Sequence, residues 1–538
     1  MKLNKFTALA FAAVAFGACS QMDELQPQGG TLLTSQVQET IETVPSRSNA
    51  SFNGMYTKIG KPAGISSRPD DWGFVSSFFS GDIESGDIIL PNSGYNWFSV
   101  CGELSSRNAN YANPYNRYAI VYNTVSAAND VIKSFPADTE DQEAIYKMAQ
   151  ARAIRAFAYL NIAPYFQFRY VDAKDEPCVP LVTEAEVDFT QNPRATVGEV
   201  YDQIISDLTY AVDNLEGFTR ADKSRIDKQV AHGLRARAYL AMGMYDEALA
   251  DATAAAEGYT PASIEEVSVP SFYNLSDHNW LWGYDMTVDL AAVYIYATSS
   301  AWLRSFSGYS YSAGVQVYAS INNLLYNKIP DTDVRKGWWV NEDLESPLLE
   351  HVTWAGVSGN AVATLEIDDT KMAFLPYTNV KFGMYTYGGV TNEEDWPFMR
   401  VEEMILIQAE CYANLGQEGK AIEVLDNFVK NYRNPAYSAA ITGRSITDEI
   451  WFQRRVELWG EGFANPDLRR LKKPMVRFHD GESNQPAAYR FNMPADDGWW
   501  LLRFPQSEMN TNFGIVDNTE GRSPVQDQYP ELRDGVTD

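Results

Sequence analysis

Two helical segments of this chain share one spacing of small and aromatic residues, and this feature restricts the fold more than composition does. The shared order is alanine, tyrosine, glycine and alanine. It occurs at Ala236, Tyr239, Gly243 and Ala248, and again at Ala409, Tyr412, Gly416 and Ala421. A small residue lets two helices touch, an aromatic ring fills the groove between them, and glycine permits a sharp turn. The pattern therefore predicts pairs of antiparallel helices.

This spacing is typical of tetratricopeptide helical pairs. The two copies lie about 170 residues apart, so they do not form a simple tandem array. The intervening residues 262–395 are rich in Trp, Tyr, Ser, Gly and Asn and contain only short β-like runs, such as 293–296. We therefore predict a mostly α fold, in which tetratricopeptide helical pairs form a frame that carries an irregular, loop-rich lobe with minor β-strands.

The first residues have the features of an export signal. Residues 1–18 begin with a short basic region and continue into an apolar run, which is typical of a secretory signal peptide. Gly17 and Ala18 directly precede Cys19, an arrangement that resembles a lipobox. We expect lipidation of Cys19, followed by a polar tether over residues 19–40. The alternative is an ordinary cleavage site that happens to carry a cysteine.

The charge and the ligand-type residues exclude several classes of function. The formal net charge is −28, from 43 Lys and Arg against 71 Asp and Glu, so nucleic acid is an unsuitable partner. The four histidines are scattered, and the cysteines beyond Cys19 have no metal-ligand spacing. We therefore expect no metal and no cofactor. Those three cysteines are Cys101, Cys178 and Cys411.

Catalytic patterns are also missing from the sequence. There is no G-x-S-x-G, Walker A or G-x-G-x-x-G motif. A glycosidase needs two suitably spaced carboxylates, and abundant acidic residues leave that open. However, Glu402 and Glu403 are most simply solvated helix charges, and the segment 454–461 places Arg and Glu at helical spacing, which indicates a charge network between helices. We expect a protein that is not an enzyme.

Aromatic residues with polar neighbours gather in two clusters. Flat rings suit the C–H faces of sugars, and adjacent amides and carboxylates can bind hydroxyl groups. The first cluster consists of Asp71, Trp72, Tyr95, Asn96 and Trp97. The second consists of Trp280, Trp282 and Tyr284, with Tyr294, Tyr296 and Trp302. Because alternate residues of an extended segment share a face, residues 280, 282 and 284 are expected to form a row of rings. The alternative is that these aromatics pack the loops onto the frame.

Several segments, in this order, resemble the SusD/RagB family of outer-membrane nutrient-binding lipoproteins. The leader is followed by CSQMDELQPQG, and QARAIRAFAYLNIAPYFQF is followed by VPLVTEAE. Next come TVGEVYDQIISDLTYAVDNL and VAHGLRARAYLAMGMYDEALADA. The C-terminal set is FMRVEEMILIQAECYANLG, ITDEIWFQRRVELWGEGFANPDLRRLK and LLRFPQSEMNTNFG. The resemblance covers nearly the whole chain.

The resemblance implies one SusD-like unit over residues 41–538. We expect an N-terminal helical part over 41–261, with an early aromatic loop at 61–113, then the insertion at 262–395 and a C-terminal helical part with a tail at 396–538. It further implies a lipid-anchored protein of the outer membrane, facing the exterior. Such a protein has a SusC-like TonB-dependent transporter as partner and an oligosaccharide as ligand. A peptide-binding family member, a non-catalytic tetratricopeptide scaffold and a surface hydrolase are the alternatives.

Overall fold

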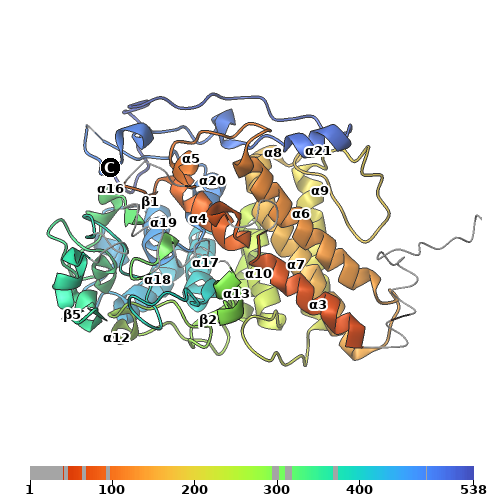
Figure 1. Ribbon diagram of the computed structural model, residues 1–538, viewed down its shortest axis with the longest axis horizontal. Coiled ribbons are helices and arrows are strands. Elements are labelled where there is room, and N and C mark those ends of the chain that lie inside the picture. The colour runs from red at the N-terminus through yellow and green to blue at the C-terminus, as the bar shows by residue number, and fades with distance from the viewer. Residues whose placement is uncertain are drawn as a thin grey trace, which may run out of the picture.

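Helices dominate the fold of the protein in the computed structural model (Figure 1). The structure describes residue 40 and residues 46–62, 68–91, 97–293, 302–308, 318–366, 373–479 and 481–538. The long helices of the N-terminal half are α3 (Ser46–Ile59), α4 (Gly73–Ser85), α6 (Ala112–Lys133), α7 (Gln142–Phe166), α9 (Val197–Asn214), α10 (Lys228–Met242) and α11 (Tyr245–Ala256). Those of the C-terminal half are α17 (Val401–Asn414), α18 (Glu418–Tyr432), α19 (Ile446–Glu457) and α20 (Ala464–Arg470). The mostly α prediction is confirmed.

The predicted helix pairs form, and they pack through the small residues that the spacing singled out. Helix α10 packs on α11, and α17 packs on α18. Gly243 ends α10 in the left-handed region with a φ of 74°, and its N–H donates to the carbonyl oxygens of Leu240 and Tyr239. The alanines of both copies, Ala236, Ala248, Ala409 and Ala421, are fully buried.

The two copies meet in space although the insertion separates them in sequence. Helix α11 of the first copy packs against α17 of the second. The contacts of α6 with α7, α7 with α9 and α9 with α10 continue the same layer towards the N-terminus (Figure 1). The frame is therefore continuous, and the residues between α11 and α17 project from it as an excursion.

Local chemistry explains where several frame helices begin. Thr196 and Glu199 form a capping box, in which each side chain accepts a hydrogen bond from the backbone N–H of the other. The carboxylate of Asp227 accepts from the N–H of Val230 at the start of α10. Asp141 caps α7 in the same way. These caps satisfy N–H groups that lack partners within the helix.

The excursion contains only short elements in its described part. Its helical pieces are α12 (Ile264–Val267), α13 (Val288–Val293), α16 (Asn323–Tyr326), η2 (Val334–Trp338), η3 (Pro347–His351) and η4 (Gly359–Thr364). Its strands are β2 (Trp280–Tyr284), β3 (Ser320–Ile321), β4 (Thr353–Trp354), β5 (Val357–Ser358) and β6 (Trp396–Arg400), while β1 (Ile88–Ile89) lies outside it. The strands pair antiparallel as β1 with β3, β2 with β6 and β4 with β5. The loop-rich lobe with minor strands is confirmed.

Contacts between residues far apart in sequence connect the C-terminal part of the molecule to its N-terminal helices. Helix α20 packs against α4, and the C-terminal tail crosses one side of the helical layer (Figure 1). The N–H of Leu502 donates to the carbonyl of Tyr165, and Arg107 donates to the carbonyl of Trp500. The remaining short elements are η1 (Pro69–Asp71), α5 (Ser99–Gly102), α8 (Tyr170–Ala173), η5 (Ala439–Ile441), η6 (Ala487–Tyr489), η7 (Gly498–Trp500) and α21 (Gln506–Thr511). Of the helices in the described residues, none combines the length and the apolar character that crossing a membrane requires.

Candidate functional site

The predicted row of rings at residues 280–284 lies in the core. All five residues of β2 are buried, with Trp280 and Trp282 fully so and Tyr284 only 7% exposed. The ring of Trp282 lies 4.9 Å from that of Phe157 and 4.8 Å from that of Phe398. The expectation of an exposed row is therefore wrong, because β2 pairs with β6 and is covered on both faces.

Three further residues of the predicted clusters are buried as well. Asp71 and Trp72 are fully buried at the start of α4, where the N–H of Trp72 donates to Ser76 Oγ at 2.9 Å. Trp302 is 1% exposed and packs edge-on against Phe98 at 5.0 Å. Phe98 belongs to the early loop and Trp302 to the insertion, so these two regions meet at this contact. They meet through packing, however, and the prediction that Trp72 and Trp302 offer faces to a ligand is wrong.

Trp97 is the predicted ring that remains half-buried. The guanidinium of Arg68 lies 4.5 Å from the centre of its ring. Arg68 in turn donates to both carboxylate oxygens of Asp70, at 2.8 and 2.6 Å. Arg68 is 25% exposed, and burial raises the pKa of the Asp70 carboxyl although Arg68 opposes that shift. We call Trp97, Arg68 and Asp70 the Trp97 platform: a half-buried ring with the paired guanidinium of Arg68 over one face.

The contribution of Arg68 and Asp70 was not predicted from sequence. Arg68 precedes Trp97 by 29 positions, and no local spacing links the two. The stretch RPDDW offers only a partial signal, because an arginine two positions before a carboxylate can form the fork seen here. The remaining predicted residues, Tyr95, Asn96, Tyr294, Tyr296 and Cys19, lie outside the described residues, so their roles stay predictions.

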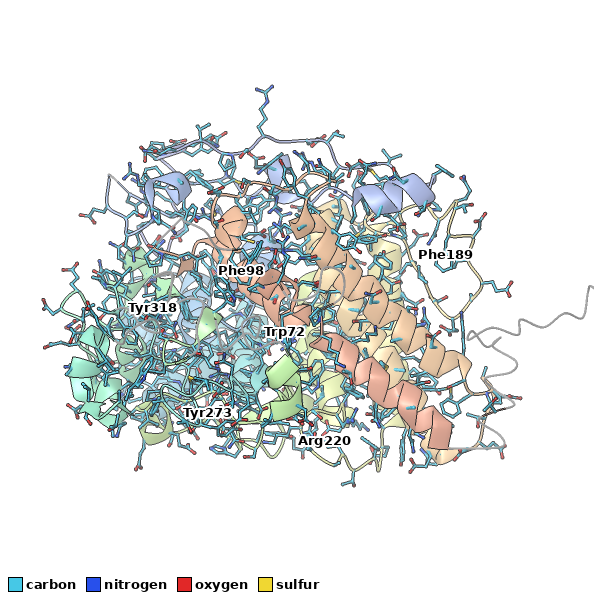
Figure 2. The ribbon with its side chains drawn as sticks, viewed as in Figure 1. Trp72, Phe98, Phe189, Arg220, Tyr273 and Tyr318 are labelled. Atoms are coloured by element: carbon cyan, nitrogen blue, oxygen red, sulfur yellow. The ribbon has the colours of Figure 1, made fainter. Side chains whose placement is uncertain are left out.

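A second aromatic group reaches the surface within the insertion. Tyr385 is 47% exposed, and its ring packs edge-on against half-buried Tyr273 at 5.1 Å. Its hydroxyl donates to Asp395 at 3.4 Å, and Figure 2 places Tyr273 near the lower edge of the lobe. Arg304 fixes this region, because its fully buried guanidinium donates to the carbonyls of Gly383 and Asp395 at 2.6 and 2.8 Å.

The predicted charge network of segment 454–461 is confirmed, but it is buried. Arg455 binds Asp87 at 2.6 Å, and Arg454 binds Asp467 at the same distance. Glu457 accepts from Arg433 at 2.7 Å. These contacts connect segments that lie far apart in the sequence, so the network joins the two ends of the fold.

Glu402 and Glu403 are not solvated, contrary to the sequence interpretation. Both are buried, with Glu402 paired to Arg400 at 3.0 Å and Glu403 paired to Arg237 at 2.7 Å. Their position at the start of α17 made exposure plausible, but the helix begins inside the molecule. Among the described residues, no group of three His, Cys, Asp or Glu side chains is placed to hold a metal ion.

Two family descriptions match separate parts of the chain. The SusD family model matches residues 294–521, and a model described as "Starch-binding associating with outer membrane" matches residues 79–240. A SusD-like protein of Bacteroides ovatus is 31% identical over 122 residues, which are 22% of this chain and 21% of that protein. That alignment therefore spans about a fifth of the relative's length.

Solved structures extend the likeness over most of the chain. A SusD-like carbohydrate-binding protein of Bacteroides vulgatus has a TM-score of 0.69 at 22% identity, covering 88% of this chain and 97% of that one. A SusD superfamily protein of Bacteroides thetaiotaomicron gives 0.65 at 19% identity, covering 88% and 99%. A laminarin-binding SusD-like protein gives 0.59 at 18% identity, covering 88% and 98%. At these identities the structures show the shared fold, and together with the two family models they establish that the chain is a SusD/RagB-like protein.

Proposed function

We propose that this protein is a lipid-anchored, non-catalytic surface protein of the outer membrane that binds an oligosaccharide and delivers it to a SusC-like TonB-dependent transporter. Cys19 carries the lipid, and the Trp97 platform contributes one stacking face of the binding surface. Tyr95 and Asn96, next to Trp97 in sequence, and Tyr294 and Tyr296 complete that surface.

The single observation that carries the ligand assignment is the half-buried ring of Trp97, which has the Arg68 guanidinium over one face. Sugar rings offer C–H faces to aromatic rings and hydroxyl groups to charged side chains, and the platform supplies both. The SusD/RagB likeness supports the same assignment, since two of the similar solved proteins are described as carbohydrate-binding and laminarin-binding. The leader before Cys19 supports export and lipid attachment.

Titration calorimetry against a panel of soluble glycans, including laminarin and starch, tests the ligand class. The Trp97→Ala variant should bind the recognised glycan at least about ten-fold more weakly, because losing one stacked ring costs roughly 1.5 kcal/mol. Phe513→Ala is the matched control, since Phe513 is 70% exposed in the C-terminal tail. Binding of peptides but not of any glycan would instead favour the peptide-binding alternative.

The transporter partner and the anchor need separate tests. Copurification of a TonB-dependent transporter with the tagged protein from outer membranes is expected, and Trp97→Ala should leave it intact. If neither glycans nor peptides bind while that complex persists, the scaffold alternative replaces the capture role. Cys19→Ser should abolish incorporation of an alkyne-labelled fatty acid and release the protein from the membrane fraction.

A further inference from the structure

A cavity lies where the N-terminal and C-terminal halves of the frame meet. Its volume is about 100 Å³, and it is partly open to solvent. The walls come from α4, α7, α8, α9, α10, β6, α17, α19 and α20. They are mainly apolar, with Phe78, Leu160, Tyr170, Tyr201, Phe398 and Phe463 as the large side chains. None of these residues belongs to the Trp97 platform.

Nearly all charged side chains that line this cavity are neutralised within the protein. Arg237 forks onto Glu403 with two contacts of 2.7 Å. Asp467 binds Arg454 at 2.6 Å and Arg470 at 2.9 Å. Glu461 binds Lys381 and Arg400, and the more exposed Arg169 forks onto Asp172.

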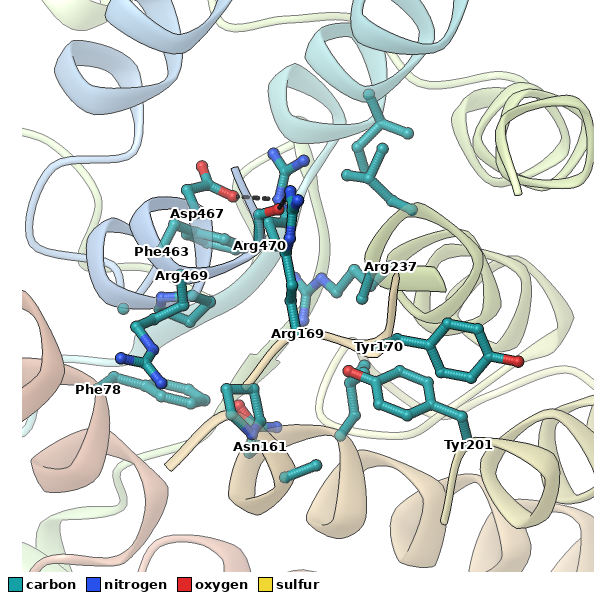
Figure 3. Close-up of a pocket in the computed structure, with 18 of the residues that line it drawn as sticks. Phe78, Asn161, Arg169, Tyr170, Tyr201, Arg237, Phe463, Asp467, Arg469 and Arg470 are labelled. Carbon is teal, nitrogen blue, oxygen red and sulfur yellow. Dashed lines mark hydrogen bonds and ion pairs between the residues drawn. The ribbon is translucent and has the colours of Figure 1, made fainter. Parts of the chain in front are cut away.

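Arg469 is the exception among these described side chains. It is only 7% exposed, yet both of its terminal nitrogens, Nη1 and Nη2, lack a hydrogen-bond partner. Phe168 and Trp500 lie 5.1 and 5.3 Å from the guanidinium, so the neighbours of the cation are aromatic rings and no carboxylate pairs with it. Figure 3 shows Arg469 beside Phe78 and Phe463, on the opposite side of the cavity from Tyr170 and Tyr201.

The surroundings of Arg469 increase the free-energy cost of leaving its guanidinium without a counterion. Burial, and next the neighbouring Arg107, lower the pKa of Arg469 to about 9, so the guanidinium is charged at neutral pH. Nearby Glu84 is already shared by Arg107 and Arg117, each at 2.9 Å. Arg477, also buried, donates to backbone carbonyls of Ile83 and Glu84 at 3.1 and 3.0 Å and brings no carboxylate. The interior here has more cations than anions, which favours binding of a negative charge.

We infer that this cavity binds a small apolar monocarboxylate, whose carboxylate pairs with Arg469 and whose apolar body lies among Phe78, Phe463 and the tyrosine rings. The planar guanidinium matches a carboxylate with two parallel hydrogen bonds. A monoanion fits because one cation is unpaired, and a second negative charge would lie in an apolar site without a partner. The volume of about 100 Å³ is smaller than the roughly 150 Å³ apolar cavity that binds benzene, so only a small ligand fits, with part of it in the opening to solvent.

A neighbouring cavity shares the wall formed by Phe168, Arg169 and Arg469 but differs in chemistry. Its other charged lining residues are Lys472, which pairs with Asp172, and the carboxylates of Asp172, Glu176, Asp496, Asp517 and Glu520. Acidic side chains repel a carboxylate, so this second cavity is the poorer anion site. Ala241 lines only the first cavity and Ala495 only the second, which allows the two to be separated by mutation.

Titration of the purified protein with phenylacetate, hexanoate, phenylacetamide and glucuronate tests the inference. Phenylacetate or hexanoate should bind at least about ten-fold more tightly than the neutral amide, because a charge-assisted hydrogen bond to a buried guanidinium is lost with the charge. The comparison between phenylacetate and hexanoate distinguishes an aromatic from an aliphatic body. Equal affinity for phenylacetate and phenylacetamide, or preference for glucuronate, overturns the inference.

Variants locate the site independently of glycan binding. Arg469→Met should weaken phenylacetate at least about ten-fold, and Arg469→Lys should weaken it less, because lysine keeps the charge but loses the fork. If Arg469→Met does not fold, the Ala241→Phe variant decides, since it fills the first cavity without touching Arg469. Ala495→Phe is its matched control and should bind normally. Loss of binding in Ala495→Phe but not in Ala241→Phe overturns the assignment.

Discussion

Replacing Glu457 with glutamine should destabilise the protein strongly, because this carboxylate is one of four that balance four buried cations. It accepts from Arg433 at 2.7 and 2.8 Å, from Arg400 at 3.1 Å and from Arg335 at 3.3 Å. Glu402 and Glu461 pair with the same arginines or with a lysine beside them. The complete cluster consists of Arg335, Lys381, Arg400 and Arg433 with Asp333, Glu402, Glu457 and Glu461.

The magnitude follows from this charge balance. Glutamine keeps the volume of Glu457 but leaves the cluster with one buried positive charge that has no counterion. Removing one partner from a buried ion pair typically costs about 3–5 kcal/mol. Since Glu457 and all four cations are fully buried, water cannot screen the excess charge. We therefore expect the free energy of unfolding to fall by about 3–5 kcal/mol at pH 7.

The pH dependence separates charge from packing. The arginines, Arg433 foremost, overcome the effect of burial and hold the pKa of Glu457 well below its ordinary value of 4.5. A carboxylate with a depressed folded pKa stabilises the protein fully above its unfolded pKa, and that contribution is lost as pH falls below it. The difference between the native protein and Glu457→Gln should therefore shrink by about 1.4 kcal/mol for each pH unit below 4.5.

Urea unfolding followed by tryptophan fluorescence at pH 7 and pH 3.5 measures both effects. Glu423→Gln is the matched control, because Glu423 lies on the exposed face of α18, and its free energy of unfolding should change by less than about 0.5 kcal/mol. A Glu457→Gln penalty below 1 kcal/mol, or one that is the same at both pH values, would refute the reasoning.

Three further outcomes are expected. Gly73→Ala should lower the melting temperature, costing about 1–3 kcal/mol, because Gly73 has a φ of 60° and an added Cβ would lie 2.3 Å from the Ile59 carbonyl oxygen; an unchanged melting temperature would contradict this. Trp282→Phe should cost about 1–3 kcal/mol of stability but leave glycan affinity unchanged, which calorimetry checks, because the ring faces the core. Burial raises the pKa of three thiols to about 12, so they should resist a thiol reagent in the native protein and react in urea; fast native labelling would argue against the core placement of Cys101, Cys178 and Cys411.

The helical frame could be predicted because its determinants are local. Alanines at contact positions and a glycine at each turn specify how two helices pack, whatever follows in the chain. The side-by-side packing of α11 on α17 could not be read in this way, since it joins residues on either side of the long excursion. The sequence likewise indicated a charge network in segment 454–461. It could not indicate that Arg455 pairs with Asp87, because those two residues lie far apart in the chain.

The prediction of an exposed row of rings was wrong for a different reason. The sequence did contain a signal that this strand is buried. Trp280 to Tyr284 reads W-L-W-G-Y, an unbroken apolar run. Alternation of apolar with polar residues indicates a half-exposed strand, whereas a short continuous run is typical of a strand buried on both faces. Leu281 and Gly283, which lie between the rings in sequence, are also buried.

The aromatic richness of the chain is better explained by the geometry of its two parts than by ligand binding. The alanine-rich helices of the frame pack closely together. They therefore carry few large side chains at the surface that contacts the irregular lobe. Large rings fill that junction, as Trp282 does against Phe157 and Phe398. Within the described residues, tryptophans are mostly interior, while Trp97 stays half-buried and Tyr385 is 47% exposed. The proposed glycan binding therefore rests on a few rings and on the charged groups near them, so a single substitution at Trp97 should weaken it more than several substitutions in β2.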